Sequence, residues 1–141
     1  ADTVRLAGHS KGGIAALEAA RREPPGTVDR VVTVASPHHG VGPAWASEVL
    51  EHVPFAPQFL QDLASGSPAL RGQVADGPFD VVAIHGGPSD GLVSARSATI
   101  SGPRATNVET DFDGWRSTHG FNVSHDEDML DAIQAALAAP R

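Results

Sequence analysis

The chain has 141 residues, of which 40% are hydrophobic, a formal net charge of −7 and no cysteine. This length suits one compact domain, and the hydrophobic fraction suits a globular protein rather than a disordered one. The negative charge argues against nucleic acid as a partner, and the lack of cysteine excludes disulfides, thiolate zinc sites and cysteine nucleophiles. The sequence contains no run of about 18 apolar residues, the length that a membrane-spanning helix needs. No signal peptide is visible, so the sequence leaves the compartment open.

Strands and helices are expected to alternate along the first half of the chain. A short strand at residues 3–7 runs into Gly8, and a helix is predicted over residues 11–22, ending before two prolines. The β-branched run at residues 28–35 is typical of a strand buried on both faces. Within residues 44–75, apolar spacing and prolines predict two short amphipathic helices that form a cap-like insert.

The second half predicts two further strands and a closing helix. Asp80 to His85 is a third buried strand, and residues 107–110 form a weaker one. The last helix is predicted over residues 126–138, with Ser124 and Glu127 at the spacing of a capping box. The alternation predicts an α/β fold: one domain over the whole chain, with a parallel sheet flanked by helices.

A candidate nucleophile stands at the first strand-to-helix junction. The segment Gly8-His9-Ser10-Lys11-Gly12 matches the G-x-S-x-G nucleophile elbow, and a strand precedes it while a helix follows it. The two glycines of the motif are expected to let strand and helix approach closely. The helix N-terminus would stabilise negative charge developing near the serine. We therefore predict Ser10 as the nucleophile and the backbone N–H of Lys11 as an oxyanion donor.

An elbow serine needs an acid and a base that follow it in the chain. Asp90 is the preferred acid, because its glycine-rich loop follows the third strand and ligand-facing groups collect at the carboxyl ends of parallel strands. Asp80 starts that strand and would lie at the opposite edge. Glu109 and Asp111, at the end of the next strand, are weaker alternatives.

Two histidines follow Asp90, and His125 is preferred over His119 as the base. His125 stands just ahead of the last helix. A helix N-terminus disfavours an imidazolium ion and so helps to keep the base neutral. His119 remains the alternative.

The other histidines are interpreted as structural, and no metal or cofactor is expected. A zinc site built on His38, His39 and His85 would lack a tight ligand motif. The segment at residues 111–114 faintly resembles a calcium loop, but its remaining ligands and closing Glu are missing. The histidines assigned to packing, loop or surface positions are His9, His38, His39, His52 and His85.

Five segments together resemble the lipase/esterase branch of the α/β-hydrolase superfamily, from the nucleophile elbow onward. The segment Ser36-Pro37-His38-His39-Gly40 is similar to the TPHHG turn of bacterial triacylglycerol lipases, which is more specific than the elbow alone. The matching segments are residues 4–13, 31–40, 59–70, 81–93 and Ser124-His125 with the helix that follows.

The resemblance implies cleavage of carboxylic esters, including lipid-like ones, through an acyl-enzyme on Ser10. His125 would move the proton and Asp90 would orient it. Acyl transfer or thioester hydrolysis by the same triad is the alternative activity, and a non-catalytic remnant is the rival reading. Three aromatic residues of the insert would line the substrate site, or equally would pack in the core: Trp45, Phe55 and Phe59.

Three departures from the family pattern stand out. Lys11 replaces the more usual methionine, and the segment at residues 113–121 is long for the stretch before the family histidine. The family's first strands, which carry the second oxyanion donor, have no counterpart before Ser10. We therefore expect a fragment or an unusually short relative, with the edge of the Thr3–Ala7 strand open to self-association.

Overall fold

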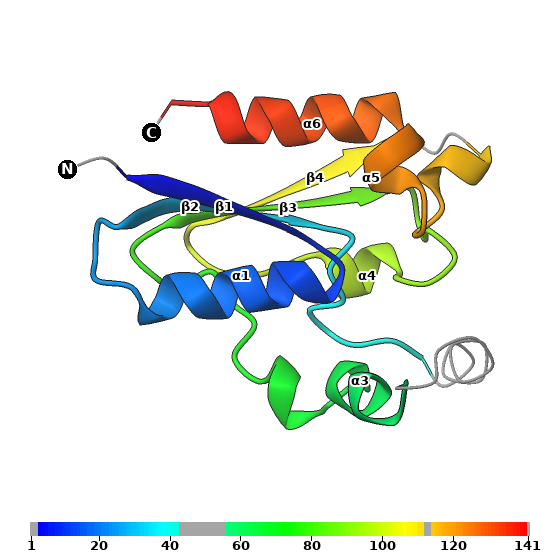
Figure 1. The fold of residues 1–141 in the computed structure, drawn as a ribbon, viewed down its shortest axis with the longest axis horizontal. Coiled ribbons are helices and arrows are strands. Elements are labelled where there is room, and N and C mark those ends of the chain that lie inside the picture. Colours follow the sequence, from blue (N-terminus) through cyan, green and yellow to red (C-terminus); the bar gives the residue numbers. More distant parts are fainter. Residues whose placement is uncertain (1–2, 43–55, 112–113, 141) are drawn as a thin grey trace.

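The computed structural model describes residues 3–42, 56–111 and 114–140 (Figure 1). The described residues contain four strands, all parallel, in the order β1-β2-β3-β4. The predicted α/β class with a parallel sheet is confirmed. The strands are β1 Val4–His9, β2 Val28–Val34, β3 Asp80–Gly86 and β4 Ala105–Thr110. The helices are α1 Lys11–Arg22, α3 Ala56–Leu63, α4 Ala95–Ala98, α5 Asn122–His125 and α6 Glu127–Ala138, with short 3₁₀ turns at Pro68–Leu70 and Gly114–Ser117.

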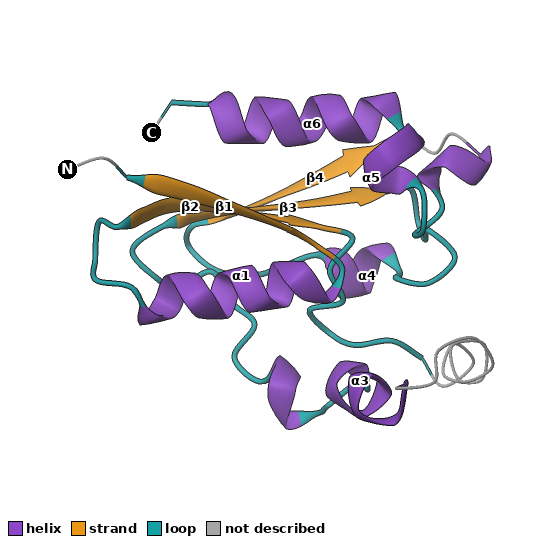
Figure 2. Ribbon diagram, in the orientation of Figure 1, coloured by secondary structure: helices purple, strands orange, loops and turns teal. Residues whose placement is uncertain are grey.

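Helices cover both faces of this sheet (Figures 1 and 2). Helix α6 lies on one face, over β2, β3 and β4, while α1 packs on the other face against β1 and β2. Helix α4 lies on the same side as α1, and α3 lies farther from the sheet on that side. Parallel strands need such cover on both faces, because each successive side chain points to the opposite side.

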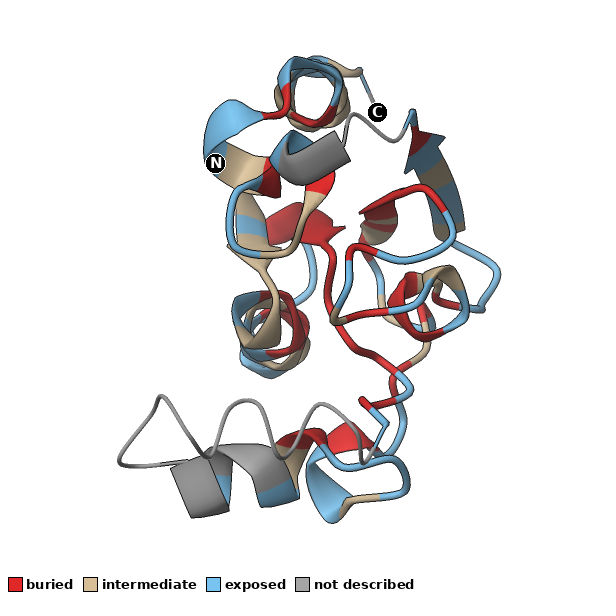
Figure 3. Ribbon diagram, turned by 90° about the vertical axis from the view of Figure 1, so that its right-hand side faces the viewer, coloured by how far each residue is buried: buried red, intermediate tan, exposed pale blue. Residues whose placement is uncertain are grey.

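Strand β2 is the centre of the core, and all seven of its residues are buried. Val31 packs with Leu17 of α1 on one face, whereas Val32 packs with Met129 of α6 on the other. All four side chains have an exposed fraction of 0%. Figure 3 shows the buried positions concentrated in the sheet and on the helix surfaces turned toward it. The apolar run in β2 therefore reflects burial on both faces, as its sequence predicts.

Pro57 lies in the first turn of α3, which tolerates proline because the N–H groups of that turn have no partner within the helix. The structure corrects one local prediction, the N-terminal cap of the last helix. The cap of α6 is Asp126, whose side chain accepts a hydrogen bond from the N–H of Met129. The Ser124 hydroxyl instead donates to the carbonyl of Phe121, so the predicted capping box is wrong.

No helix in the described ranges combines the length and the apolar character that crossing a membrane requires. The helix expected near Trp45 lies outside the described residues.

Candidate active site

The serine of the elbow stands at a sharp turn between β1 and α1. Ser10 has φ 56° and ψ −130°, a combination that residues with a Cβ rarely adopt. The turn is held on both sides: the N–H of Ser10 donates to the carbonyl of Val34 at 2.8 Å, and its carbonyl accepts from the N–H of Gly13 at 3.1 Å. This conformation places Ser10 at the carboxyl end of β1 and directly before the N-terminus of α1.

Close approach of strand and helix depends on Gly8 and Gly13. A Cβ at Gly8 would lie 2.3 Å from the backbone of Gly12, and a Cβ at Gly13 would lie 2.0 Å from the hydroxyl oxygen of Ser36. A Cβ at Gly12 would meet nothing within 4 Å. The expectation that both glycines of the motif are needed for packing is therefore right for Gly8 and wrong for Gly12; the second crowded position is Gly13.

A hydrogen-bonded chain joins Ser10 to a histidine and a carboxylate. The Nε2 atom of His119 lies 2.9 Å from the Ser10 hydroxyl oxygen, and its Nδ1 atom lies 2.7 Å from Oδ2 of Asp90. Because a carboxylate only accepts, Nδ1 must donate, which leaves Nε2 of the neutral ring as the acceptor for the serine hydroxyl. This arrangement can activate a serine hydroxyl as a nucleophile.

The carboxylate of Asp90 is buried and held by four donors. Its side chain is 3% exposed. Oδ1 accepts from the backbone N–H groups of Leu92 at 3.0 Å and Val93 at 2.7 Å, while Oδ2 accepts from His119 and, at 3.4 Å, from the amide of Asn122. Donors on both oxygens fix the rotation of the carboxylate, so it presents one oxygen to the imidazole.

The loop that carries His119 is fastened to two other elements. The N–H of His119 donates to the carbonyl of Asp90 at 3.0 Å, so the two residues are joined through backbone as well as side chain. Two residues earlier, the buried Ser117 hydroxyl donates to Asp126, the cap of α6. The long segment before the closing helix is thereby held with His119 over the end of β1.

His125 is not in this position: the structure brings His119, and not the preferred His125, between Ser10 and Asp90. His125 is the last residue of α5, is exposed, and has its Nδ1 2.7 Å from the Ser124 hydroxyl and its ring edge-on to Phe121. The spacing of Ser124 and Glu127 predicts one cap over residues 124–127. In the structure a separate turn of helix ends at His125, and the cap is the next residue. No local signal distinguishes the two histidines, because the choice depends on contacts with Asp90 and Ser10.

The backbone and the side chain of Lys11 have different surroundings. Its backbone opens α1 directly after Ser10, in the position predicted for an oxyanion donor. Its ammonium group lies 2.6 Å from a carboxylate oxygen of Asp62 in α3. The hydrogen bond from Lys11, followed by one from Gln58, lowers the pKa of Asp62. The charge that replaces the usual methionine is therefore paired with α3.

The alternative acids lie away from the histidine. Asp80 forms ion pairs with Arg104 at 2.7 Å and Arg30 at 3.5 Å, and Glu109 and Asp111 are exposed.

His38 is buried between Gln73 and Thr33, with ring nitrogens at 3.1 and 3.0 Å from their oxygens. Burial lowers the pKa of His38 to about 4, against the opposing effect of the Gln73 hydrogen bond, so this ring is neutral. His85 bonds to the carbonyl of Gly87. Within the described ranges, no group of three or more His, Cys, Asp or Glu could hold a metal ion.

Of the three predicted lining residues, one falls in a described element. Trp45 and Phe55, together with His52, lie outside the described residues. Phe59 is described only as a backbone position in α3.

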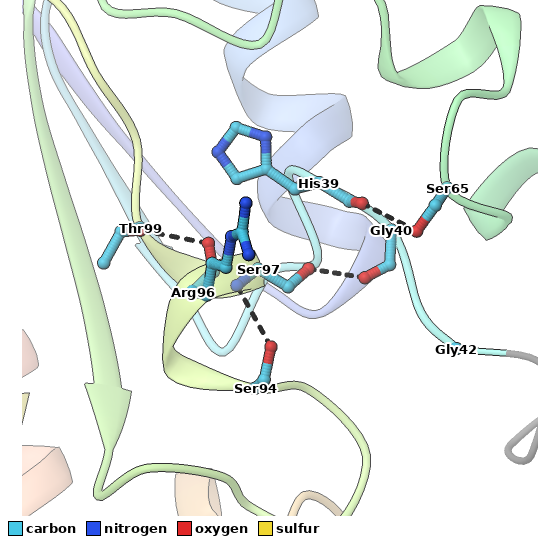
Figure 4. A pocket seen from close by; sticks show the side chains of 8 residues that line it. All are labelled: His39, Gly40, Gly42, Ser65, Ser94, Arg96, Ser97 and Thr99. Atoms are coloured by element: carbon cyan, nitrogen blue, oxygen red, sulfur yellow. Dashed lines mark hydrogen bonds between the residues drawn. The ribbon is translucent and has the colours of Figure 1, made fainter.

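A cavity of about 640 Å³ lies between the loop after β2 and α4, and none of Ser10, Asp90 and His119 lines it. Its walls carry two basic side chains, His39 from the loop and Arg96 from α4, among serines and glycines (Figure 4).

No protein-family model matches the sequence, and no curated protein matches it either. Among solved structures, the chain is similar to a lipase from Bacillus licheniformis in its mature form, with a TM-score of 0.57 and 19% sequence identity. The match covers 97% of this chain and 66% of that chain, so this chain spans slightly less than two thirds of the lipase. At this identity the likeness shows the fold alone. The parallel sheet, the elbow and the match together show that the chain has an α/β-hydrolase-like fold.

Proposed function

We propose that this chain is a serine hydrolase that cleaves carboxylic esters, with Ser10 as the nucleophile, His119 as the base and Asp90 as the group that orients His119. The observation that carries the proposal is the continuous hydrogen-bonded chain from Ser10 through His119 to Asp90, at 2.9 and 2.7 Å. Three segments far apart in the sequence converge to make it.

The geometry supports a two-step reaction. The Ser10 oxygen attacks the ester carbonyl carbon as His119 Nε2 takes the hydroxyl proton. The resulting imidazolium keeps its Nδ1 proton on Asp90 and is stabilised by that carboxylate. His119 then returns a proton to the leaving alcohol, which leaves an acyl group on Ser10. A water molecule, deprotonated by the same Nε2, releases the acid and restores the hydroxyl.

The tetrahedral oxyanion of each step lies nearest the start of α1 in this proposal. The backbone N–H of Lys11 donates to it, and the positive end of the helix adds to the stabilisation. Because the Lys11 side chain is engaged with Asp62, it is the backbone of this residue that takes part.

The substrate class is proposed as apolar or lipid-like acyl esters. The resemblance of the sequence to bacterial lipases supports it, and so does the likeness in fold to a protein described as a lipase. Acyl transfer and thioester hydrolysis would use the same three residues, and no observation favours either.

A fluorophosphonate probe tests the nucleophile. We expect it to label Ser10 covalently, with mass spectrometry placing the adduct on the peptide that contains the elbow. The chain should hydrolyse p-nitrophenyl esters, and Ser10→Ala should lower the turnover by about 10³-fold or more. Labelling at Ser36 or Ser124 would refute the assignment of Ser10.

A matched pair of histidine variants tests the base. His119→Ala should lose activity by about 10³-fold or more, since it removes the proton acceptor. His125→Ala should keep nearly full activity, because this ring is exposed and lies against Ser124 and Phe121, whereas His119 lies against Ser10 and Asp90. The opposite result would return the base to His125 and overturn the proposed triad.

A further inference from the structure

A buried polar pair beside the triad is not used by the proposed mechanism. Asn122, the first residue of α5, has an exposed fraction of 0%. Its Nδ2 lies 3.4 Å from Oδ2 of Asp90, the oxygen that also accepts from His119. Its Oδ1 has no hydrogen-bond partner. The Nε2 of His9 is also buried without a partner. Unpaired buried polar atoms are rare in folded proteins, so two at one site call for an explanation.

His9 lies against the ring of His119. The two ring centroids are 4.7 Å apart and the planes are tilted by 35°. Burial lowers the pKa of His9, and the nearby His119 lowers it further; Asp90, Asn122 and the backbone of His119 act in the opposite direction. His9 is therefore neutral at pH 7 and carries one ring proton. The Asn122 side chain acts on His9 as a hydrogen-bonding group. Its unpaired oxygen can accept from His9 Nε2 only if the ring proton lies on that nitrogen.

We propose that His9 and Asn122 form a positioning pair for the triad, an inference that rests on the proposed function. Asn122 links the carboxylate of Asp90 to the imidazole of His9, with its amide donating to the former and its oxygen accepting from Nε2–H of the latter. His9 in turn covers one face of His119. The pair limits rotation of Asp90 and tilting of His119, which keeps Nε2 aimed at Ser10.

The charges around the pair support a neutral bridge. Four hydrogen-bond donors already stabilise the negative charge of Asp90. His119 becomes positive during the proposed reaction. A carboxylate in place of Asn122 would repel Asp90, and a cation in place of His9 would repel the imidazolium of His119. A carboxamide and a neutral imidazole hydrogen-bond without either penalty.

The first test uses the unaltered chain and does not depend on activity. Nitrogen-15 NMR distinguishes the two neutral tautomers of a histidine ring. We expect His9 to carry its proton on Nε2. A proton on Nδ1 would leave Nε2 unable to donate to Asn122 and would overturn the proposal, whether or not the chain hydrolyses esters.

The second test compares Asn122→Leu with Gln73→Leu. Both changes remove a buried carboxamide that lies near a histidine, but Gln73 bonds to His38, which is not part of the triad. The readouts are water exchange of the His119 Nδ1 proton, followed by NMR, and separate kcat and KM values for p-nitrophenyl acetate. We expect Asn122→Leu to accelerate exchange about tenfold or more and to lower kcat about 10- to 100-fold at nearly constant KM, as for a small misplacement of the base. Gln73→Leu should change neither.

Equal exchange and equal kcat in the two leucine variants would overturn the proposal, since Asn122 would then serve only packing. His9→Phe and His9→Ala extend the comparison if Asn122→Leu does not fold. Phenylalanine keeps a ring against His119 without the donor, so we expect faster exchange than in the unaltered chain, and faster still with alanine. Unchanged exchange in both His9 variants would also refute the positioning role. If the fluorophosphonate probe did not label Ser10 in the unaltered chain, that result would instead count against the proposed function.

Discussion

Adding one methyl group to either of two neighbouring glycines of α1 should have opposite effects on stability. Gly12 and Gly13 both lie in the helix with negative φ, so alanine is conformationally favourable at both positions. At Gly12 the added Cβ meets nothing within 4 Å, and the free energy of unfolding should rise by up to about 1 kcal/mol through the helix propensity of alanine.

The same change at Gly13 forces the helix away from the sheet. The added Cβ would lie 2.0 Å from the hydroxyl oxygen of Ser36 and 2.9 Å from both the Cβ of Ser36 and the carbonyl oxygen of Gly8. Rotating the hydroxyl relieves only the first contact. Overpacking of this kind costs about 1–3 kcal/mol, which exceeds the gain from propensity. Because the propensity gain is common to both changes, the two variants should differ by this overpacking cost, about 1–3 kcal/mol, or roughly 4–12 °C in melting temperature for a chain of this size.

Thermal and urea unfolding, followed by circular dichroism, measure this difference. Ser36→Gly should partly rescue Gly13→Ala, because it removes two of the three crowding atoms while the Gly8 carbonyl remains. Equal stability of the Gly12→Ala and Gly13→Ala variants, or no rescue, would show that the strand and helix are not in the close contact described.

Three further predictions concern other parts of the chain. The pKa of His38 in the folded chain lies near 4, below its usual 6.5, so the unfolded chain binds the proton more readily. The free energy of unfolding should therefore be full above pH 6.5 and should fall by about 3 kcal/mol toward pH 4. Urea titrations should find this loss reduced in His38→Gln. Asp126→Ala removes the cap of α6 and the partner of Ser117, so it should cost about 2 kcal/mol in thermal unfolding and slow ester turnover. The control Ser124→Ala should change the free energy of unfolding by less than about 0.5 kcal/mol. Equal costs of the two changes would restore Ser124 as the cap. Strand β1 pairs only with β2 among the described strands, and its Val4 is 47% exposed. Light scattering should therefore show self-association of the chain, and Val4→Lys should reduce it. A monomer at all concentrations would contradict this prediction.

Much of the fold is readable from the sequence because its signals are local. The apolar run of β2 reports burial on both faces, and α1 begins and ends where the serine elbow and the prolines place it. The position of Ser10 follows from five consecutive residues. That of Asp90 follows from a rule about strand ends, which needs only the strand to be recognised.

Tertiary structure alone decided which histidine meets the serine. His119 and His125 are six positions apart in the sequence, and either could reach Ser10 in an extended loop. The choice is made by contacts between segments distant in the chain: the backbone bond from His119 to Asp90, and the bond between Ser117 and Asp126 that fastens the loop to α6.

The same limit applies to Lys11 and Gly13. A motif states which residue types stand near the nucleophile, but the direction of the Lys11 side chain depends on Asp62, and the crowding at Gly13 depends on Ser36 at the end of another strand. Residue patterns determine local conformation because backbone propensities and burial act over a few residues. The geometry of a site assembled from several segments depends on how those segments pack together, and no single stretch of sequence contains that information.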